Sequence, residues 1–180
     1  ACEEWIDVRA FGQVFGFNDQ KGMSEGIRGP VSIQSAFSVC PVMIDSMQIT
    51  KSVNGAGKGK ASDTMGMKHK VTSAMYVAKG SINHQLAQKT GFTDEDAEKI
   101  KEALRTLFVN DASAARPDGS MEVCKVYWWR HNCPMGQYSS AKVHRSLKIS
   151  ANTELPKCFE DYSITVEALD GLEPEVIEGV

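Results

Sequence analysis

A stretch rich in glycine and lysine, SVNGAGKGKASDTMGMKHK at residues 52–70, holds residue types suited to gripping phosphate. Lysine supplies a positive charge, and glycine allows an anion to approach the backbone closely. A nucleotide-binding P-loop requires the pattern GxxxxGK[ST] between a strand and a helix. Here the fifth residue after Gly55 is Lys60, no Gly-Lys pair is followed by Ser or Thr, and no helical pattern follows. The stretch therefore does not match a P-loop.

Nucleic acid is the other source of phosphate that this region suits. Its bases outnumber its acids, as the set Lys51, Lys58, Lys60, Lys68, Lys70 and His69 against Asp63 shows. A basic loop suits a phosphate backbone, which rewards charge and tolerates imprecise geometry. The aromatic segment VYWWRH at 126–131 adds a possible stacking surface, with one Trp in the core and the other exposed to bases. Periodicity leaves open the alternative that both tryptophans are core or interface residues.

Other chemistries have weaker support. His131, Cys133, Cys124 and His144 are zinc-ligand types, but their spacing matches no zinc finger or ribbon. No GxSxG elbow accompanies the Ser, His and Asp residues of the chain. We therefore expect no cofactor, no bound metal and no catalytic activity.

Length and composition are those of an ordinary globular domain. The chain has 180 residues, which fits one domain, and no apolar run reaches the roughly 18–20 residues of a membrane helix. The acidic N-terminus lacks the basic-then-apolar pattern of a signal peptide. The five cysteines are widely spaced without a CxxC pair, which favours a reducing compartment. A cytoplasmic protein is the prediction.

Charge is unevenly distributed along the chain. The net charge is −3, but residues 154–180 hold eight acids and one base, while residues 123–153 hold five bases and no acid. A local basic surface of this kind attracts a polyanion. The alternative interpretation is an ordinary solvated face.

Alternating and β-rich patterns predict strands at 41–50, 71–82, 121–131 and 161–169, with solvated chain beyond Gly171. The first two strands flank residues 51–70, which predicts a long hairpin or protruding loop. A helix is predicted from Thr93, whose capping box would include Asp96. Its expected core stripe is Ala97, Ile100, Leu104, Leu107 and Phe108. This order of elements indicates an α+β fold with an antiparallel sheet.

Six short blocks resemble, in order, the RNA-binding backbone subunit of the type I-C CRISPR surveillance complex, Cascade. They are DVRAFGQVF (7–15), IRGPV (27–31), QIT (48–50), MGMKHKV (65–71), TGFTDED (90–96) and NDASAARPDGSM (110–121). The resemblance covers the chain from Asp7 to about Val166. The chain differs from the usual family pattern at Met67, Ala112 and Ser32.

The resemblance implies a single RRM-like (ferredoxin-like) palm over residues 1–180, with residues 51–64 forming a β-hairpin thumb. It also implies that family members have a segment before the DVR block, including a first palm strand, that this chain does not contain. Its implied partners are CRISPR RNA, neighbouring copies of the subunit, other Cascade subunits and, through the guide, target DNA. No membrane partner is implied.

The RNA-binding residues implied by the matching blocks are basic side chains of the thumb and of three loops. They are Arg9, Arg28, Lys51, Lys58, Lys60, Lys68, His69 and Arg116. Arg116 has an alternative structural role, because it could pair with Asp111.

The expected function is non-catalytic, sequence-independent binding of CRISPR RNA along its backbone, within an antiviral filament. One alternative is a metal-dependent ribonuclease, like related backbone subunits of type III complexes, with Asp63 or Asp7 as the candidate carboxylate. Another is an assembly domain that contacts protein alone.

Overall fold

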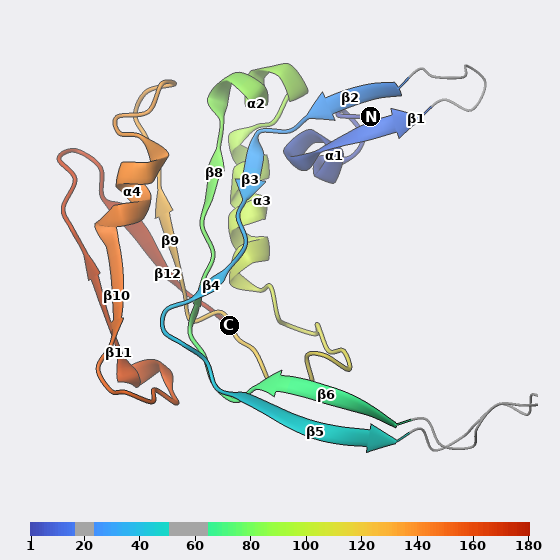
Figure 1. Ribbon diagram of the computed structural model, residues 1–180. Coiled ribbons are helices and arrows are strands. Elements are labelled where there is room, and N and C mark those ends of the chain that lie inside the picture. The colour runs from blue at the N-terminus through green and yellow to red at the C-terminus, as the bar shows by residue number, and fades with distance from the viewer. Residues whose placement is uncertain (17–23, 51–64) are drawn as a thin grey trace, which may run out of the picture. The chain divides into compact units, whose positions relative to one another are not determined.

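The structure, a computed structural model, describes residues 1–16, 24–50 and 65–180. Its helices and strands are mostly short, and strands β1 to β8 follow one another between α1 and α2 (Figure 1). The helices are α1 (Ile6–Phe11), α2 (His84–Thr90), α3 (Asp94–Arg105), α4 (Ser140–Ser146) and the 3₁₀ turn η1 (Phe159–Asp161). The strands are β1 (Gly12–Gly16), β2 (Ser24–Arg28), β3 (Val31–Ile33), β4 (Phe37–Ser38), β5 (Ile44–Thr50), β6 (Met65–Val71), β7 (Tyr76–Val77), β8 (Gly80–Ile82), β9 (Lys125–Trp129), β10 (Leu147–Ala151), β11 (Tyr162–Val166) and β12 (Pro174–Glu178).

Within the described ranges, the strands pair two by two. The pairs are β1–β2, β3–β8, β4–β7, β5–β6, β9–β12 and β10–β11. The first five are antiparallel in their residue register. The mixed fold with small antiparallel sheets agrees with the predicted α+β class. A single RRM-like sheet stays a prediction, because the described ladders are separate.

The chain divides into two compact units. The larger unit contains Ala1–Ser35, Ala78–Lys148 and Thr165–Val180, and the smaller unit contains Ala36–Val77 and Ile149–Ile164. All buried apolar side chains among the described residues belong to the larger unit: Val8, Ala10, Val31, Ala87, Val143 and Leu172. The described part of the smaller unit contains no buried residue. Hydrophobic stabilisation is therefore concentrated in the larger unit.

Helix α3 organises the larger unit. Its N-terminus has the predicted capping box, in which the Thr93 hydroxyl accepts from the Asp96 amide and the Asp96 carboxylate accepts from the Thr93 amide. The helix contacts β9, and Lys101 Nζ lies 5.8 Å from the ring centre of Trp128. The predicted core stripe is only half-buried, and Leu107, beyond the end of the helix, is 51% exposed. The buried residue of α3 is instead Asp96.

A close backbone approach fixes the entry into the first hairpin. Gly12 ends α1 with φ of 81°, a conformation that favours glycine. Gly29 follows β2 and lies so close to α1 that a Cβ there would be 2.2 Å from the Ala10 carbonyl oxygen. The absence of a side chain at residue 29 thus allows α1 and the end of β2 to pack together.

All four predicted strands are shorter than their sequence patterns, and the one expected at 41–50 begins at Ile44. The pattern at 71–82 is divided among the last residue of β6, β7 and β8, because these segments pair with three different partners, β5, β4 and β3. The rest of β6, residues 65–70, lies in the stretch expected to connect two strands. The patterns at 121–131 and 161–169 shorten to β9 and β11. In β11 the predicted alternation holds for Tyr162, Ser163 and Ile164, which are half-buried, exposed and half-buried.

The prediction of solvated chain beyond Gly171 is wrong. Strand β12 pairs with β9 along five residues, and Leu172 just before it is 3% exposed. Two of its acids meet bases, since Glu175 lies 2.8 Å from Lys101 and Glu178 lies 2.7 Å from Lys125. Backbone pairing and the buried Leu172 hold the acidic segment in place. The prediction failed because it rested on the charge of the segment.

Gly29→Ala should destabilise the protein. The added methyl group overlaps the backbone of Ala10 and Phe11, and such overpacking costs about 1–3 kcal/mol. Gly26→Ala in neighbouring β2 is the matched control, because its Cβ would meet nothing within 4 Å. Urea unfolding of both variants gives the comparison. Equal midpoints for the two variants would contradict the close approach.

Candidate nucleic-acid interface

The two-stranded arm formed by β5 and β6 flanks the sequence stretch with which the phosphate hypothesis began (Figure 1). Seven residue pairs form the ladder, from Ile44 opposite Val71 to Thr50 opposite Met65. Every residue of both strands is exposed. The hairpin prediction for residues 51–64 stays a prediction, because those residues lie outside the described ranges. Lys51, Lys58 and Lys60, and the alternative Asp63, lie outside the described residues.

Cross-strand partners share a face of a ladder, so the register assigns each side chain to one of two faces. We call them the lysine face and the methionine face. The lysine face comprises Asp45, Met47, Ile49, Gly66, Lys68 and Lys70. The methionine face comprises Ile44, Ser46, Gln48, Thr50, Met65, Met67, His69 and Val71.

The predicted phosphate contacts Lys68 and His69 therefore project from opposite faces. Lys68 shares its face with Lys70, which lies 3.4 Å from the Asp45 carboxylate. This pair is exposed on both sides and is worth little in water. On the other face, His69 Nδ1 and Ser46 Oγ are 2.8 Å apart. A single phosphate on one face cannot meet both predicted residues.

Arg9 is committed to an intramolecular ion pair. Its Nε and Nη2 atoms donate to Asp96 Oδ2 and Oδ1 at 2.7 and 2.8 Å, and Nη1 donates to the Cys2 carbonyl at 2.5 Å. The Arg9 hydrogen bond, with the Thr93 amide, lowers the pKa of Asp96 from 3.8 to about 2, against the opposing effect of burial. The same bond raises the pKa of Arg9. The pair joins α1 to the N-terminus of α3.

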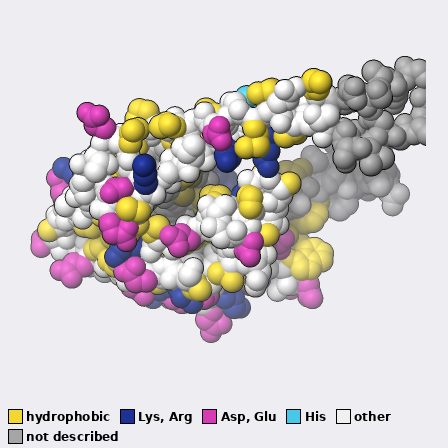
Figure 2. All heavy atoms as spheres, turned by 90° about the horizontal axis from the view of Figure 1, so that it is seen from below, with side chains coloured by type: hydrophobic (Ala, Val, Ile, Leu, Met, Phe, Trp, Pro, Cys, Tyr) yellow, Lys and Arg dark blue, Asp and Glu magenta, His cyan; other side chains and the backbone are white. Residues whose placement is uncertain are grey.

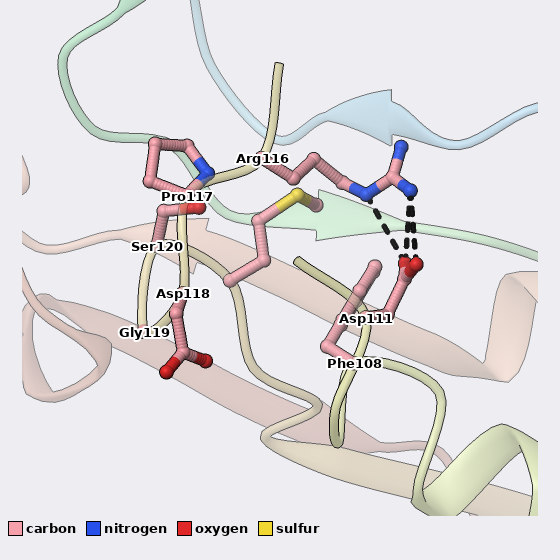
Figure 3. Close-up of a pocket in the computed structure, with 8 residues that line it drawn as sticks. Phe108, Asp111, Arg116, Pro117, Asp118, Gly119 and Ser120 are labelled. Atoms are coloured by element: carbon pink, nitrogen blue, oxygen red, sulfur yellow. Dashed lines mark hydrogen bonds and ion pairs between the residues drawn. The ribbon is translucent and has the colours of Figure 1, made fainter. Parts of the chain in front are cut away.

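Arg116 is likewise paired, as the alternative interpretation expected. Its Nε and Nη2 atoms each lie 3.2 Å from an Asp111 carboxylate oxygen, and its backbone N–H donates to Ser113 Oγ. Figure 3 shows the Arg116 side chain extended to Asp111, with Asp118 pointing away from the pair. These residues line a small hollow with Phe108 and residues 117–121. The pair is partly exposed, so it organises the 111–116 loop at small energetic gain.

Arg28 is the candidate with the least engaged side chain. It ends β2 opposite Gly12 and is exposed. No ion pair to Arg28 is found in the part of the chain that the structure describes. Its neighbour Gly29 packs on Ala10 and Phe11, so Arg28 lies near the end of α1. Arg28 is thus a predicted RNA-binding residue that packing places near α1.

The basic segment 123–153 is largely neutralised by acids. Lys125 pairs with Glu178, Arg130 with Asp94, and Lys148 with Glu167. Two of these acids come from the acidic segment 154–180. On the face shown in Figure 2, basic side chains lie close to acidic ones. These pairings favour the alternative of an ordinary solvated face, because acids distant in sequence come to three of the five bases.

The aromatic residues of β9 are half-buried rather than divided between core and solvent. Tyr127 and Trp129 share a face and stack with centroids 6.1 Å apart, while Trp128 lies beneath Lys101 on the opposite face. The Trp129 Nε1 atom is buried and has no hydrogen-bond partner among the described residues. Neither Trp matches the prediction of an exposed stacking platform.

Asp7, the other candidate carboxylate, lies exposed on α1. Across residues 1–16, 24–50 and 65–180, no group of three His, Cys, Asp or Glu side chains is arranged to hold a metal ion. His131 Nδ1 accepts from the Gln137 amide, and His144 Nε2 lies 3.0 Å from the Gly80 carbonyl oxygen. Both histidines thus have roles within the fold.

The exposed arm and the larger unit each hold part of the predicted set. Lys68 and His69 belong to the smaller unit, whereas Arg9, Arg28 and Arg116 belong to the larger one. Sequence reasoning missed the division of β6 into two chemically different faces. The alternation Met65, Met67, His69 against Lys68 and Lys70 was the available signal, and it required the strand to be recognised at 65–71.

Comparison with known proteins places the chain in a family. The family described as CRISPR-associated protein Cas7 matches residues 1–167, and the chain therefore belongs to that family. No curated protein matches the chain. In the described segments, no helix combines the length and apolar character required to cross a bilayer.

Asp96→Asn should lower stability at neutral pH by about 3 kcal/mol, because it leaves Arg9 half-buried beside a neutral amide. In the parent protein, the lowered pKa of Asp96 stabilises the fold fully above about pH 4. That contribution, about 2 kcal/mol, is lost as the pH falls toward 2. Urea unfolding across this range should show an acid-dependent loss that is larger in the parent than in the variant by about 2 kcal/mol.

Asp94→Asn provides the control within the same helical turn. Its side chain is 82% exposed and pairs with an exposed Arg130, so the change should cost less than about 1 kcal/mol. An Asp96→Asn profile that follows the parent between pH 4 and 2 would contradict the assigned role of the Arg9 pair.

Proposed function

We propose that this chain is an RNA-binding backbone subunit of a type I-C CRISPR surveillance complex, Cascade, and that it is non-catalytic. Membership of the Cas7 family supports a CRISPR-associated role. The six sequence blocks support the finer assignment to type I-C. In this proposal, several copies assemble along one CRISPR RNA, beside other subunits of the complex.

The observation that carries the proposal is the exposed β5–β6 arm. A two-stranded ladder exposed on both faces is marginally stable alone in water. It leads directly into residues 51–64, the Gly- and Lys-rich stretch. We propose that this arm is the base of the thumb, and that RNA and a neighbouring copy cover it in the complex.

The basic residues contribute unequally in this proposal. Arg28 and Lys68 present exposed cationic side chains from β2 and β6 and are the leading phosphate contacts among the described residues. Lys51, Lys58 and Lys60, which follow β5 in sequence, add further positive charge in this proposal. Arg9 and Arg116 act mainly through their pairs with Asp96 and Asp111, so their attraction for phosphate is reduced.

Contacts to phosphate and sugar are independent of base sequence. A guide-holding subunit needs this independence because spacers differ from one CRISPR RNA to the next. Base pairing between the guide and target DNA then reads the sequence. The lysine face of the arm carries no amide or carboxamide array for reading bases, which fits phosphate contact.

Lys68→Ala should weaken the binding of unrelated single-stranded RNAs by the same factor. Each lost phosphate contact should reduce the slope of log K against log salt by about 0.7. The double variant Lys58→Ala/Lys60→Ala should reduce it by about 1.4 on the same basis. Fluorescence anisotropy at several salt concentrations, with three RNAs of different sequence, measures both effects.

Lys99→Ala is the matched control, since it removes an exposed lysine from α3 with no predicted role in RNA binding. It should leave affinity and slope at parent values. Loss of affinity for one RNA alone, or equal losses in Lys68→Ala and Lys99→Ala, would contradict phosphate contact by the arm.

The non-catalytic part of the proposal predicts that bound RNA stays at full length with Mg²⁺ or Mn²⁺. A denaturing gel of labelled RNA after incubation gives the result. Regularly spaced products that vanish in Asp63→Ala would instead establish the metal-dependent ribonuclease alternative. Asp7→Ala serves as the second carboxylate variant.

A further inference from the structure

Three soft or borderline metal donors follow one another on the methionine face of β6. Met65, Met67 and His69 occupy alternate positions of the strand, and their β5 partners are Thr50, Gln48 and Ser46. Alternate residues point to the same side, with about 6.6 Å between successive Cα atoms of the set. Met65 is 65% exposed and Met67 56% exposed, so both thioethers are accessible from solvent.

We propose that Met65, Met67 and His69 form a binding site for a soft monovalent cation of the Cu(I) class. Thioether sulfur selects soft metal ions, and imidazole is a good additional ligand for copper. The methionine face carries no carboxylate, because Asp45 projects from the other face and pairs there with Lys70. The donor set therefore disfavours Mg²⁺ and Ca²⁺, which require oxygen ligands.

Strand β5 supplies groups that position two of the three ligands. Ser46 Oγ lies 2.8 Å from His69 Nδ1, which leaves Nε2 as the metal-binding atom. Gln48 Nε2 donates to Met65 Sδ at 2.9 Å and holds that sulfur on the methionine face. A hydrogen-bonded partner that orients a ligating histidine is a recurrent feature of metal sites.

The methionine side chains can adapt to one ion. Methionine has three rotatable bonds and a polarisable sulfur, so Met65 and Met67 can turn toward a cation bound by His69. The lysines between these ligands in sequence lie on the opposite face and do not compete for the same space. The proposed site does not rest on the proposed RNA binding, and it does not include residues 51–64.

Silver(I) is the probe, because it mimics Cu(I) without redox chemistry. Cysteine thiols bind the same ions, and Cys133 and Cys158 are exposed, so all samples are first alkylated with iodoacetamide. Titration with Ag(I), followed by ¹³C-methyl methionine NMR and calorimetry, should show one ion per chain. Two methyl signals should move, those lost in Met65→Leu and Met67→Leu.

Met47→Leu is the matched control, since Met47 lies on the lysine face of the same ladder. It should bind silver like the parent, whereas Met65→Leu/Met67→Leu should lose the site. Ser46→Ala should weaken binding about tenfold through loss of the His69 partner. Circular dichroism must show the parent fold for each variant.

Equal silver binding by Met65→Leu/Met67→Leu and Met47→Leu would overturn the proposal. So would a titration that shifts all methionine methyl signals alike. RNA affinity of the Met65→Leu/Met67→Leu variant is measured separately, so failure of the metal site is distinguishable from failure of RNA binding.

Discussion

The ion pair between Arg9 and Asp96 is the constraint on which the larger unit depends. The Asp96 carboxylate, whose side chain is 3% exposed, accepts hydrogen bonds from Nε and Nη2 of Arg9 and also completes the capping box of α3. Burying such a charge without its partner is costly. The pair therefore couples the start of the chain to α3, and through α3 to the ladder of β9 and β12. The basic residue of this pair, Arg9, is one that the family resemblance assigned to RNA binding.

The two units differ in how far they bury their side chains. The larger unit has buried apolar side chains, a capped helix and bases neutralised by distant acids. The smaller unit exposes every residue of its longest ladder, with apolar and cationic side chains on the same arm. Large exposed apolar side chains beside lysines suit a surface that is covered in an assembly. This division supports the proposed backbone role, in which the arm contacts groups outside its own chain.

Local sequence signals predicted local structure well. The capping box at Thr93 and Asp96 and the α+β class each depend on neighbours in sequence. Residues 65–70 were expected to connect two strands and instead form most of β6. The pairing of β12 with β9 joins segments about 50 residues apart, and charge pattern alone suggested solvent for it. Neutralisation of Lys125 and Lys148 has the same long-range origin. The helical stripe also overestimated burial, because it extended past Arg105 to Leu107.

The sequence predicted the types of the site residues, but it did not predict their partners or the faces from which they project. Motif matching identified Arg9, Arg28 and Arg116 equally, since all three are basic residues in family blocks. The structure separates them: two are bound by carboxylates, while Arg28 is exposed at the end of β2. Lys68 and His69 are adjacent in sequence, and the strand register places them on opposite faces. Partners and faces are properties of the folded chain, which residue type does not specify.

The most direct test of the backbone assignment is whether the protein retains guide RNA. The chain would be co-expressed with a CRISPR array and purified, its ratio of absorbance at 260 and 280 nm measured, and any bound RNA sequenced. The account predicts RNA of repeat–spacer–repeat origin, with all spacers represented. Protein that purifies without RNA, or with RNA unrelated to the array, would contradict it.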